Sequence, residues 1–163
     1  MKEYPKLKAL SKMKNEMTLT RSQIRANREK WARFLMKPGR KKYGGALDNG
    51  GGARCCLGHG AYALGVSRVK KLAGWFAYGE DQENNCAPEE FVDLVGLYTD
   101  NGRVDNLGEC LDGWDHESLV EVNDNTDATP QEIGKYLLSV IDGGPHTPFR
   151  PLSDYPKQLE TRP

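Results

Sequence analysis

The stretch GGALDNGGGARCCLGHGAYALG, residues 44–65, lies between a basic N-terminal part of the chain and an acidic middle. Glycines this close together are typical of backbone that takes positive φ angles or approaches another group closely. Asn49-Gly50 favours a tight turn, and residues 43–47 and 53–57 on either side are short enough to be its paired strands. We therefore expect an antiparallel hairpin at this point.

A second interpretation of the same glycines is an anion-binding nest. Consecutive backbone N–H groups can bind a phosphate, and the basic residues Lys41, Lys42 and Arg54 flank the loop. The phosphate-binding motif G-x-x-x-x-G-K-[ST] is absent from the sequence. The hairpin is therefore the preferred interpretation, and a nucleotide-like anion is the ligand that a nest would take.

The length of 163 residues suits one domain with its own core and is short for two. Hydrophobic residues make up only 37% of the chain, and its 18 glycines and 9 prolines indicate many loops around a modest core. We expect a single small α+β domain over residues 20–142, with about four helices packed on a short antiparallel hairpin or sheet. Residues 1–19 form a basic N-terminal arm, and residues 143–163 form an extended proline-rich tail.

Local capping signals mark the ends of several helices. Thr20 and Gln23 fit a capping box for a helix that runs to about Met36. Residues 56–64 carry apolar side chains at helical spacing. Thr129 followed by Pro130 starts the last helix of the domain, and we expect the helices to bury apolar residues together, among them Trp31, Leu57 and Leu137.

Other boundaries are less well defined by the sequence. Pro88 suits the first position of a helix. Asp115 can cap a short helix that Asn123 and Asp124 then end. Residues 66–78 fit a helix and an extended segment equally well, so their structure stays open.

The net charge of zero hides a strong asymmetry along the chain. Residues 1–71 contain 18 Lys or Arg and 4 Asp or Glu, whereas residues 72–132 contain 1 and 16. Exposed ion pairs stabilise a protein by only about 0 to 1 kcal/mol each, so partners explain the asymmetry better than stability does. We expect the two charges to stay apart, with Glu80, Asp81 and Glu83 contacting a basic surface of a host protein.

The charge distribution and the motifs of the sequence make nucleic acid an unlikely partner. The basic helix and the cluster around Lys41 could contact phosphates. However, no zinc-finger, helix-turn-helix or aromatic base-stacking motif is present in the sequence, and the acidic middle would repel a duplex.

The cysteines are expected to be free thiols. The sequence shows neither a secretion signal nor an apolar run near 18 residues, so we expect a cytoplasmic protein without a membrane span. Cys55 and Cys56 are adjacent and do not have the C-x₂-C spacing of a zinc site, even with His59 nearby. No metal and no cofactor are expected.

The motifs Arg54-Cys-Cys-Leu-Gly58 and Val122-Asn-Asp124, the second followed by the Thr129 helix, resemble those of a family of small bacteriophage proteins of uncharacterised function. Its members have an R-x-C-C-L-G or similar core and a later N-D turn before an amphipathic helix. The resemblance covers roughly residues 28–141, and this sequence departs from it at His59 and in an acidic insert at 80–90. It implies a phage origin and a location in the host cytoplasm, but no activity.

Three hypotheses for function follow. The first is a non-catalytic phage accessory protein that binds and inhibits or redirects a host protein. The second is an anti-defence protein that sequesters a nucleotide-like anion, and the third is an enzyme in which His59 activates Cys56 with help from Asp124. The residues expected to contact a partner or ligand are Lys41, Lys42, Arg54, His59, Asn123, Asp124, Glu80, Asp81 and Glu83.

For Asn123 and Asp124 a purely structural role is the competing interpretation. Both side chains can cap a helix and bond to nearby backbone without contacting any ligand.

The cysteine spacing generates one direct test. Purified protein should contain no structural metal, because adjacent cysteines cannot both grip one tetrahedral ion and the chain is long enough to fold without one. Elemental analysis after dialysis measures this, and one retained equivalent of zinc per chain would contradict the prediction.

Overall fold

The computed structural model describes residues 19–104 and 109–159. The predicted N-terminal arm therefore lies outside the described residues, except for Leu19. The described chain is a small mixed α+β domain, as expected, with five α-helices and two short sheets. The helices are α2 (Arg21–Met36), α3 (Cys56–Ala63), α4 (Glu89–Val95), α5 (Leu119–Asn125) and α6 (Pro130–Ser139).

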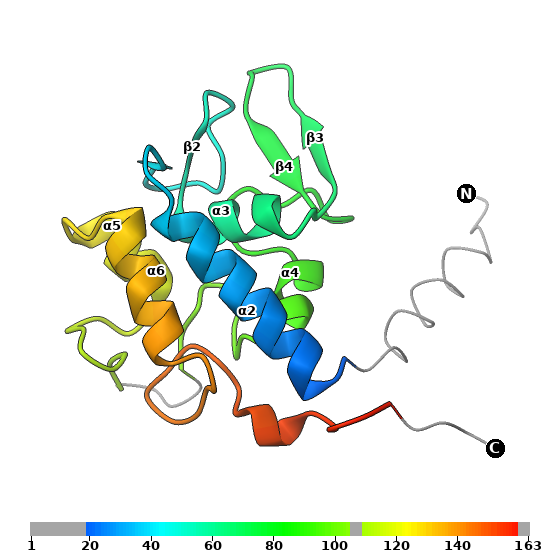
Figure 1. The fold of residues 1–163 in the computed structure, drawn as a ribbon. Coiled ribbons are helices and arrows are strands. Elements are labelled where there is room, and N and C mark those ends of the chain that lie inside the picture. The colour runs from blue at the N-terminus through cyan, green and yellow to red at the C-terminus, as the bar shows by residue number, and fades with distance from the viewer. Residues whose placement is uncertain (1–18, 105–108, 160–163) are drawn as a thin grey trace.

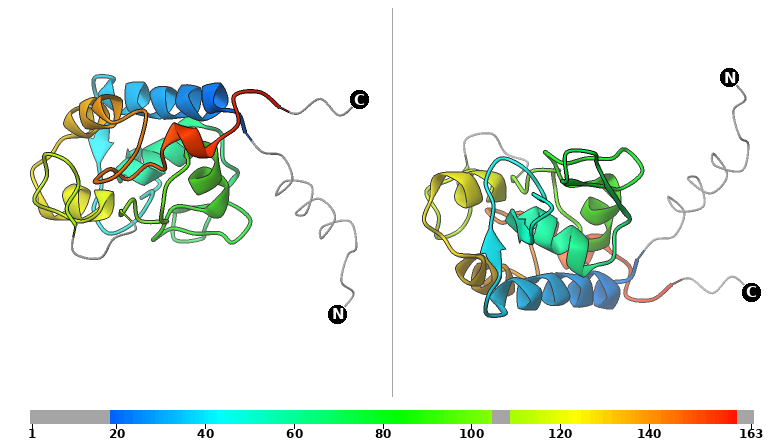
Figure 2. Two further views of the ribbon diagram at one scale, coloured as in Figure 1. Left: turned by 90° about the horizontal axis from the view of Figure 1, so that it is seen from below. Right: turned by 90° about the horizontal axis from the view of Figure 1, so that it is seen from above.

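Helix α2 is the central element of the domain. It packs along α6 and also contacts α3 and α4 (Figure 1). Seen from above and below, α2 runs along one side of the molecule, and α5 lies at the end opposite the first turn of α2 (Figure 2). None of the helices in the described part of the chain combines the length and apolar character that a bilayer span requires.

The predicted capping box at the start of α2 is confirmed. The Thr20 side chain accepts a hydrogen bond from Gln23 N at 3.3 Å, and Thr20 N donates to Gln23 Oε1 at 2.9 Å. The start of α6 is confirmed as well, because Thr129 Oγ1 accepts from Glu132 N at 3.1 Å and Pro130 is the first helical residue. These starts depend only on neighbouring residues, and a sequence pattern captures such contacts well.

The predicted hairpin of residues 43–47 and 53–57 is wrong. Strand β1 (Lys41–Lys42) instead pairs in parallel with β2 (Ala53–Arg54), and only an isolated antiparallel bridge joins Asp48 to Arg54. The second strand cannot continue, because Cys55 is the N-cap of α3 and its Sγ accepts from Gly58 N at 3.3 Å. The antiparallel sheet lies elsewhere in the chain.

That sheet is formed by residues 66–78, the segment that the sequence left open. Strands β3 (Arg68–Lys70) and β4 (Phe76–Tyr78) pair antiparallel, with Val69 opposite Ala77. Gly74, at φ +96°, closes the connection by donating its N–H to Lys71 O at 2.8 Å. Glycine takes this backbone conformation without strain.

Two helix boundaries differ from the prediction. Helix α5 is capped by Ser118 rather than Asp115, and it includes Asn123 and Asp124 instead of ending at them. Asn123 is buried and its side chain bonds to distant backbone, so it does not compete with the hydrogen bonds of its own helix. Helix α4 has Pro88 as its N-cap, one position before the expected one.

The C-terminal segment packs on the domain from residue 143 onward. Phe149 is fully buried, and the 3-10 helix η1 (Leu152–Asp154) forms in a stretch where the prolines were expected to prevent regular structure. Arg21 N at the start of α2 donates to Pro156 O at 3.0 Å.

The core forms around Trp31, as predicted together with Leu57 and Leu137. All three side chains are fully buried. The Trp31 ring meets Phe91 edge-on with centroids 4.9 Å apart, and its Nε1 donates to Cys56 O at 2.9 Å. The single polar atom of this ring is therefore satisfied inside the core.

Arg28 is fully buried, although arginine side chains are mostly exposed in proteins. Its guanidinium donates to Val95 O at 2.6 Å, to Ile141 O at 2.8 Å and to Arg150 O at 2.8 Å. It also lies 4.4 Å from the Phe149 ring centroid. Burial lowers the pKa of Arg28 to about 10, which leaves it charged at neutral pH.

The Arg28 contacts predict a large loss of stability on substitution. Arg28→Lys keeps the charge, but one ammonium group cannot reach carbonyls on three separate segments. Each buried acceptor left without a donor costs about 1–3 kcal/mol, so the free energy of unfolding should fall by about 2–4 kcal/mol. Arg25→Lys is the control at an exposed position of the same helix, and it should change stability by less than about 0.5 kcal/mol. Urea unfolding measures both, and equal effects would contradict the prediction.

Candidate functional site

The glycine-rich loop is a nest that the chain fills with its own side chains. Gly50 N donates to Asp48 Oδ1 at 2.9 Å, and Asn49 Oδ1 accepts from Gly51 N at 2.8 Å and Ala53 N at 3.2 Å. A Cβ on Gly50 would lie 1.7 Å from Gly74 O, so glycine is required there. The donors that a nucleotide-like anion would need are thus already bonded.

Asp48 is the buried centre of this region. Its Oδ2 accepts from Tyr78 Oη at 2.5 Å and from Arg54 Nε at 2.9 Å, and Arg68 Nη1 lies 3.8 Å away. Burial acts to raise the pKa of Asp48, but the hydrogen bonds from Tyr78, Gly50 and Arg54 outweigh it and lower the pKa. Burial and the bond to Asp48 raise the pKa of Tyr78 to about 12. Arg54, a predicted site residue, therefore has an internal partner.

Asn123 and Asp124 lie inside α5 and bond to backbone that is distant in the sequence, not to nearby backbone at a helix cap. Asn123 Oδ1 accepts from Cys56 N at 3.1 Å, and its Nδ2 donates to Tyr43 O at 2.9 Å. Asp124 Oδ1 accepts from Gly45 N at 3.2 Å. These bonds bring α5 against the start of α3 and fix the bend after β1.

The remaining basic residues of the predicted site also bond to backbone. His59 is fully buried and its Nε2 lies 2.8 Å from Lys41 O, which makes that nitrogen the protonated one. Lys42 Nζ donates to Thr126 O at 2.6 Å, whereas the Lys41 side chain is exposed. His59 and Lys42 therefore contact the protein's own backbone.

The adjacent cysteines have the properties of buried apolar side chains. Burial raises the pKa of Cys55 to about 12 and raises the pKa of Cys56 well above its ordinary value. Burial also lowers the pKa of His59 to about 4. With these shifts the His59 imidazole is neutral and both thiols are protonated near neutral pH, which does not favour the Cys56–His59 enzyme hypothesis.

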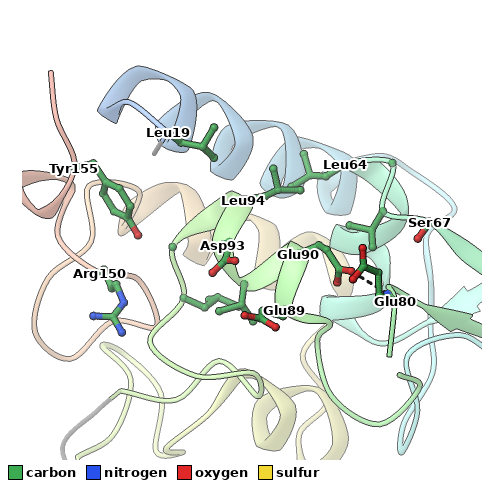
Figure 3. Close-up of a pocket in the computed structure, with 15 residues that line it drawn as sticks. Leu19, Leu64, Ser67, Glu80, Glu89, Glu90, Asp93, Leu94, Arg150 and Tyr155 are labelled. Carbon is green, nitrogen blue, oxygen red and sulfur yellow. Dashed lines mark hydrogen bonds between the residues drawn. The ribbon is translucent and has the colours of Figure 1, made fainter. Parts of the chain in front are cut away.

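A groove of about 760 Å³ lies on another part of the surface. It is bordered by the start of α2, the end of α3, helix α4 and the C-terminal segment, which contributes Arg150 and Tyr155 (Figure 3). Apolar side chains and carboxylates both line it. The apolar residues are Leu19, Leu64, Val66, Val92, Leu94 and Leu97, and the acidic residues are Glu80, Glu89, Glu90 and Asp93.

Three of the leucines and the carboxylates of α4 lie on different sides of the groove, which Arg150 also lines. In Figure 3, Leu19, Leu94 and Leu64 follow α2, while the carboxylates of α4 lie together beneath them. Of the three acidic residues predicted to meet a partner, Glu80 lines the groove but Asp81 and Glu83 do not. The acidic residues of α4 were missed, although their spacing on one predicted helix was a usable signal.

The carboxylates of the groove are close enough to repel one another. Burial, followed by the charges of Glu89 and Glu90, raises the pKa of Asp93. Glu90 Oε1 accepts from Glu80 N at 2.9 Å, which holds the loop after β4 against α4. A cation placed in the groove would relieve this repulsion.

The basic and acidic segments do not neutralise each other among the described residues. The basic residues of 19–71 that form ion pairs there use Glu29, Asp48 or Asp142, and none of those pairs reaches the acidic residues of 80–121. Arg103 and His146 supply the partners of Glu117 and Glu109. The expectation that the acidic segment stays apart from the basic arm concerns residues that lie outside the described chain, so it stays a prediction.

Compared with protein-family models, with curated proteins and with solved structures, the chain gives no match in any of the three. The resemblance to bacteriophage proteins accordingly stays a prediction. Within residues 19–104 and 109–159, no three His, Cys, Asp or Glu side chains lie where they could share a metal ion.

The buried His59 predicts a specific pH dependence of stability. Between pH 6.5 and about 4 the unfolded state binds a proton at this imidazole that the folded state does not. The free energy of unfolding should therefore fall by about 3 kcal/mol as pH decreases through this range. Asp48 adds a loss only at lower pH, because its lowered pKa places its protonation below the range of an ordinary carboxyl.

His59→Gln removes the titrating group and can still donate to Lys41 O. Its stability should be nearly constant from pH 6.5 to 4. Urea unfolding across this range measures the slope, and a His59→Gln protein with the wild-type slope would assign the pH dependence to another group.

Proposed function

We propose that the protein is a non-catalytic binding protein that inhibits or redirects a host protein by taking a basic, apolar segment of it into the groove. The observation that carries this proposal is the pairing of leucines with four carboxylates in one cavity. Burial, followed by the charges of Glu89 and Glu90, raises the pKa of Asp93, and a cationic occupant would offset the repulsion between these carboxylates.

A protein segment fits this chemistry better than a small anion. Leucine or methionine side chains of a partner would bury against the apolar side, and lysine or arginine would meet the carboxylates of α4. The shape suits an amphipathic helix, whose two faces match the two sides of the groove. Basic segments of this kind occur on proteins that bind nucleic acid, and occupying one would block that function.

The alternatives are less well supported. A nucleotide-like anion would have to displace Asp48 and Asn49 oxygens from the glycine loop, and the carboxylates of the groove would repel it. The Cys56 enzyme lacks an activated thiol. From the sequence resemblance to bacteriophage proteins, the proposal includes a phage origin and a location in the host cytoplasm.

The proposal predicts binding of a defined probe. The probe is a labelled synthetic helix of about four turns with leucines on one face and lysines on the other. Glu89→Lys with Asp93→Lys should weaken its binding at least about tenfold, because two attractions become repulsions. Wild-type affinity should also fall steeply as ionic strength rises.

The matched control is Asp115→Lys with Asp127→Lys, which changes the net charge equally at exposed positions outside the groove. It should bind within about twofold of the wild-type protein. Equal weakening in both variants, or affinity indifferent to salt, would contradict the groove as the binding site. Thermal unfolding of each variant confirms that the fold is retained.

A further inference from the structure

A row of arginines stacked on aromatic rings crosses the surface from the end of α2, over α3, to the β3–β4 sheet. We call it the arginine–aromatic row. It does not include the groove residues, and it is independent of the proposed function. Its members are Phe34, Arg40, Arg54, Tyr62, Arg68 and Phe76.

Each arginine in the row lies over a ring. The guanidinium carbon of Arg40 is 3.8 Å from the Phe34 centroid, and that of Arg54 is 4.0 Å from the Tyr62 centroid. Arg68 lies 4.8 Å from Tyr62 and 4.1 Å from the Phe76 ring. These distances are within the range of cation–π attraction, and the stacking orders side chains that would otherwise lose conformational freedom on binding.

The rings themselves connect the row. Phe34 and Tyr62 lie with centroids 5.7 Å apart, so the contacts continue from Arg40 to Phe76 without a gap. Tyr62 is 40% exposed, and it is one of the few large aromatic side chains so accessible in the described chain.

The row has an excess of positive charge. Arg54 and Arg68 share the single buried carboxylate of Asp48. Between described residues Arg40 forms no ion pair, and its Nε donates to Phe34 O at 3.1 Å. Exposed lysines flank the row at Lys37, Lys41 and Lys70.

We propose that the arginine–aromatic row binds single-stranded nucleic acid. Proteins that bind single strands combine basic side chains, which hold phosphates, with flat aromatic or guanidinium surfaces on which bases stack. An exposed Tyr62 and the partly exposed guanidinium groups of Arg40 and Arg68, each lying over a ring, supply both. An acidic peptide would use the charge but not the stacking surfaces.

No motif in the sequence marks this surface, because its members come from four separate segments. The acidic segment 80–121, which would repel a duplex, contributes no member to the row. Between described residues, the basic residues of 19–71 are not paired with the acidic segment 80–121. The row keeps its charge available for phosphates.

The test is fluorescence anisotropy of the full chain with labelled oligouridylate and oligothymidylate of about 15 nucleotides. The logarithm of the association constant should fall linearly with the logarithm of salt concentration. Arg40→Gln with Lys70→Gln should weaken binding at least about tenfold and reduce this slope. Tyr62→Leu should weaken binding at least about fivefold through lost stacking, with the slope unchanged.

Arg25→Gln with Arg33→Gln removes the same charge from exposed positions of α2 outside the row, and it should bind within about twofold of wild type. Failure of both oligonucleotides to bind at physiological salt overturns the proposal. So does a Tyr62→Leu protein that binds as wild type, or competition by polyglutamate as strong as that by unlabelled oligouridylate. Unchanged circular dichroism and thermal midpoint show that each variant folds.

Discussion

The buried guanidinium of Arg28 is the interaction on which the arrangement of the domain depends. It joins α2 to the end of α4 through Val95 O, to the chain after α6 through Ile141 O, and to the C-terminal segment through Arg150 O. These carbonyls lie at places where regular structure ends, so backbone hydrogen bonding alone does not satisfy them. One planar group with several fixed donors can serve all of them, and no other side chain has this geometry.

The same contact sets the shape of the groove. Residues 96 and 97 follow α4 directly, and Gly96 takes φ +67°, so that Arg150 N can donate to Gly96 O at 2.8 Å. A Cβ on Gly96 would lie 2.3 Å from Tyr155 Oη. The end of α4 and the C-terminal segment, which both line the groove, are therefore held close by Arg28 and by the absence of a side chain at Gly96. The width of the groove between α4 and the C-terminal segment therefore depends on buried contacts in the core.

The sequence was informative where contacts are local. Capping predicts the starts of α2 and α6, because each depends on residues within one helical turn. The parallel pairing of β1 with β2 was missed because the loop between these strands is held by bonds to residues distant in sequence, from Tyr78 to Asp48 and from Asn123 to Tyr43. Arg28 was missed for a different reason: it shares the helical face of Ile24, Trp31 and Leu35, but its charge suggested an exposed position. The groove could not be predicted, since it combines residues 64–67, 89–97 and 150–155.

The charge asymmetry of the chain gives two charged surfaces, a basic one and an acidic one, and Asp48 is an acidic residue that belongs to the basic part. Asp48 is buried, and its carboxylate accepts hydrogen bonds from Arg54 and Tyr78. Aromatic rings and the Asp48 carboxylate hold the arginines of the row in place. The carboxylates of α4 lie close enough together to repel one another. In the proposed function a cationic partner would offset this repulsion. Under the two proposals taken together, a basic protein bound to single-stranded nucleic acid would suit both surfaces, because such a complex presents lysine-rich segments and phosphates side by side.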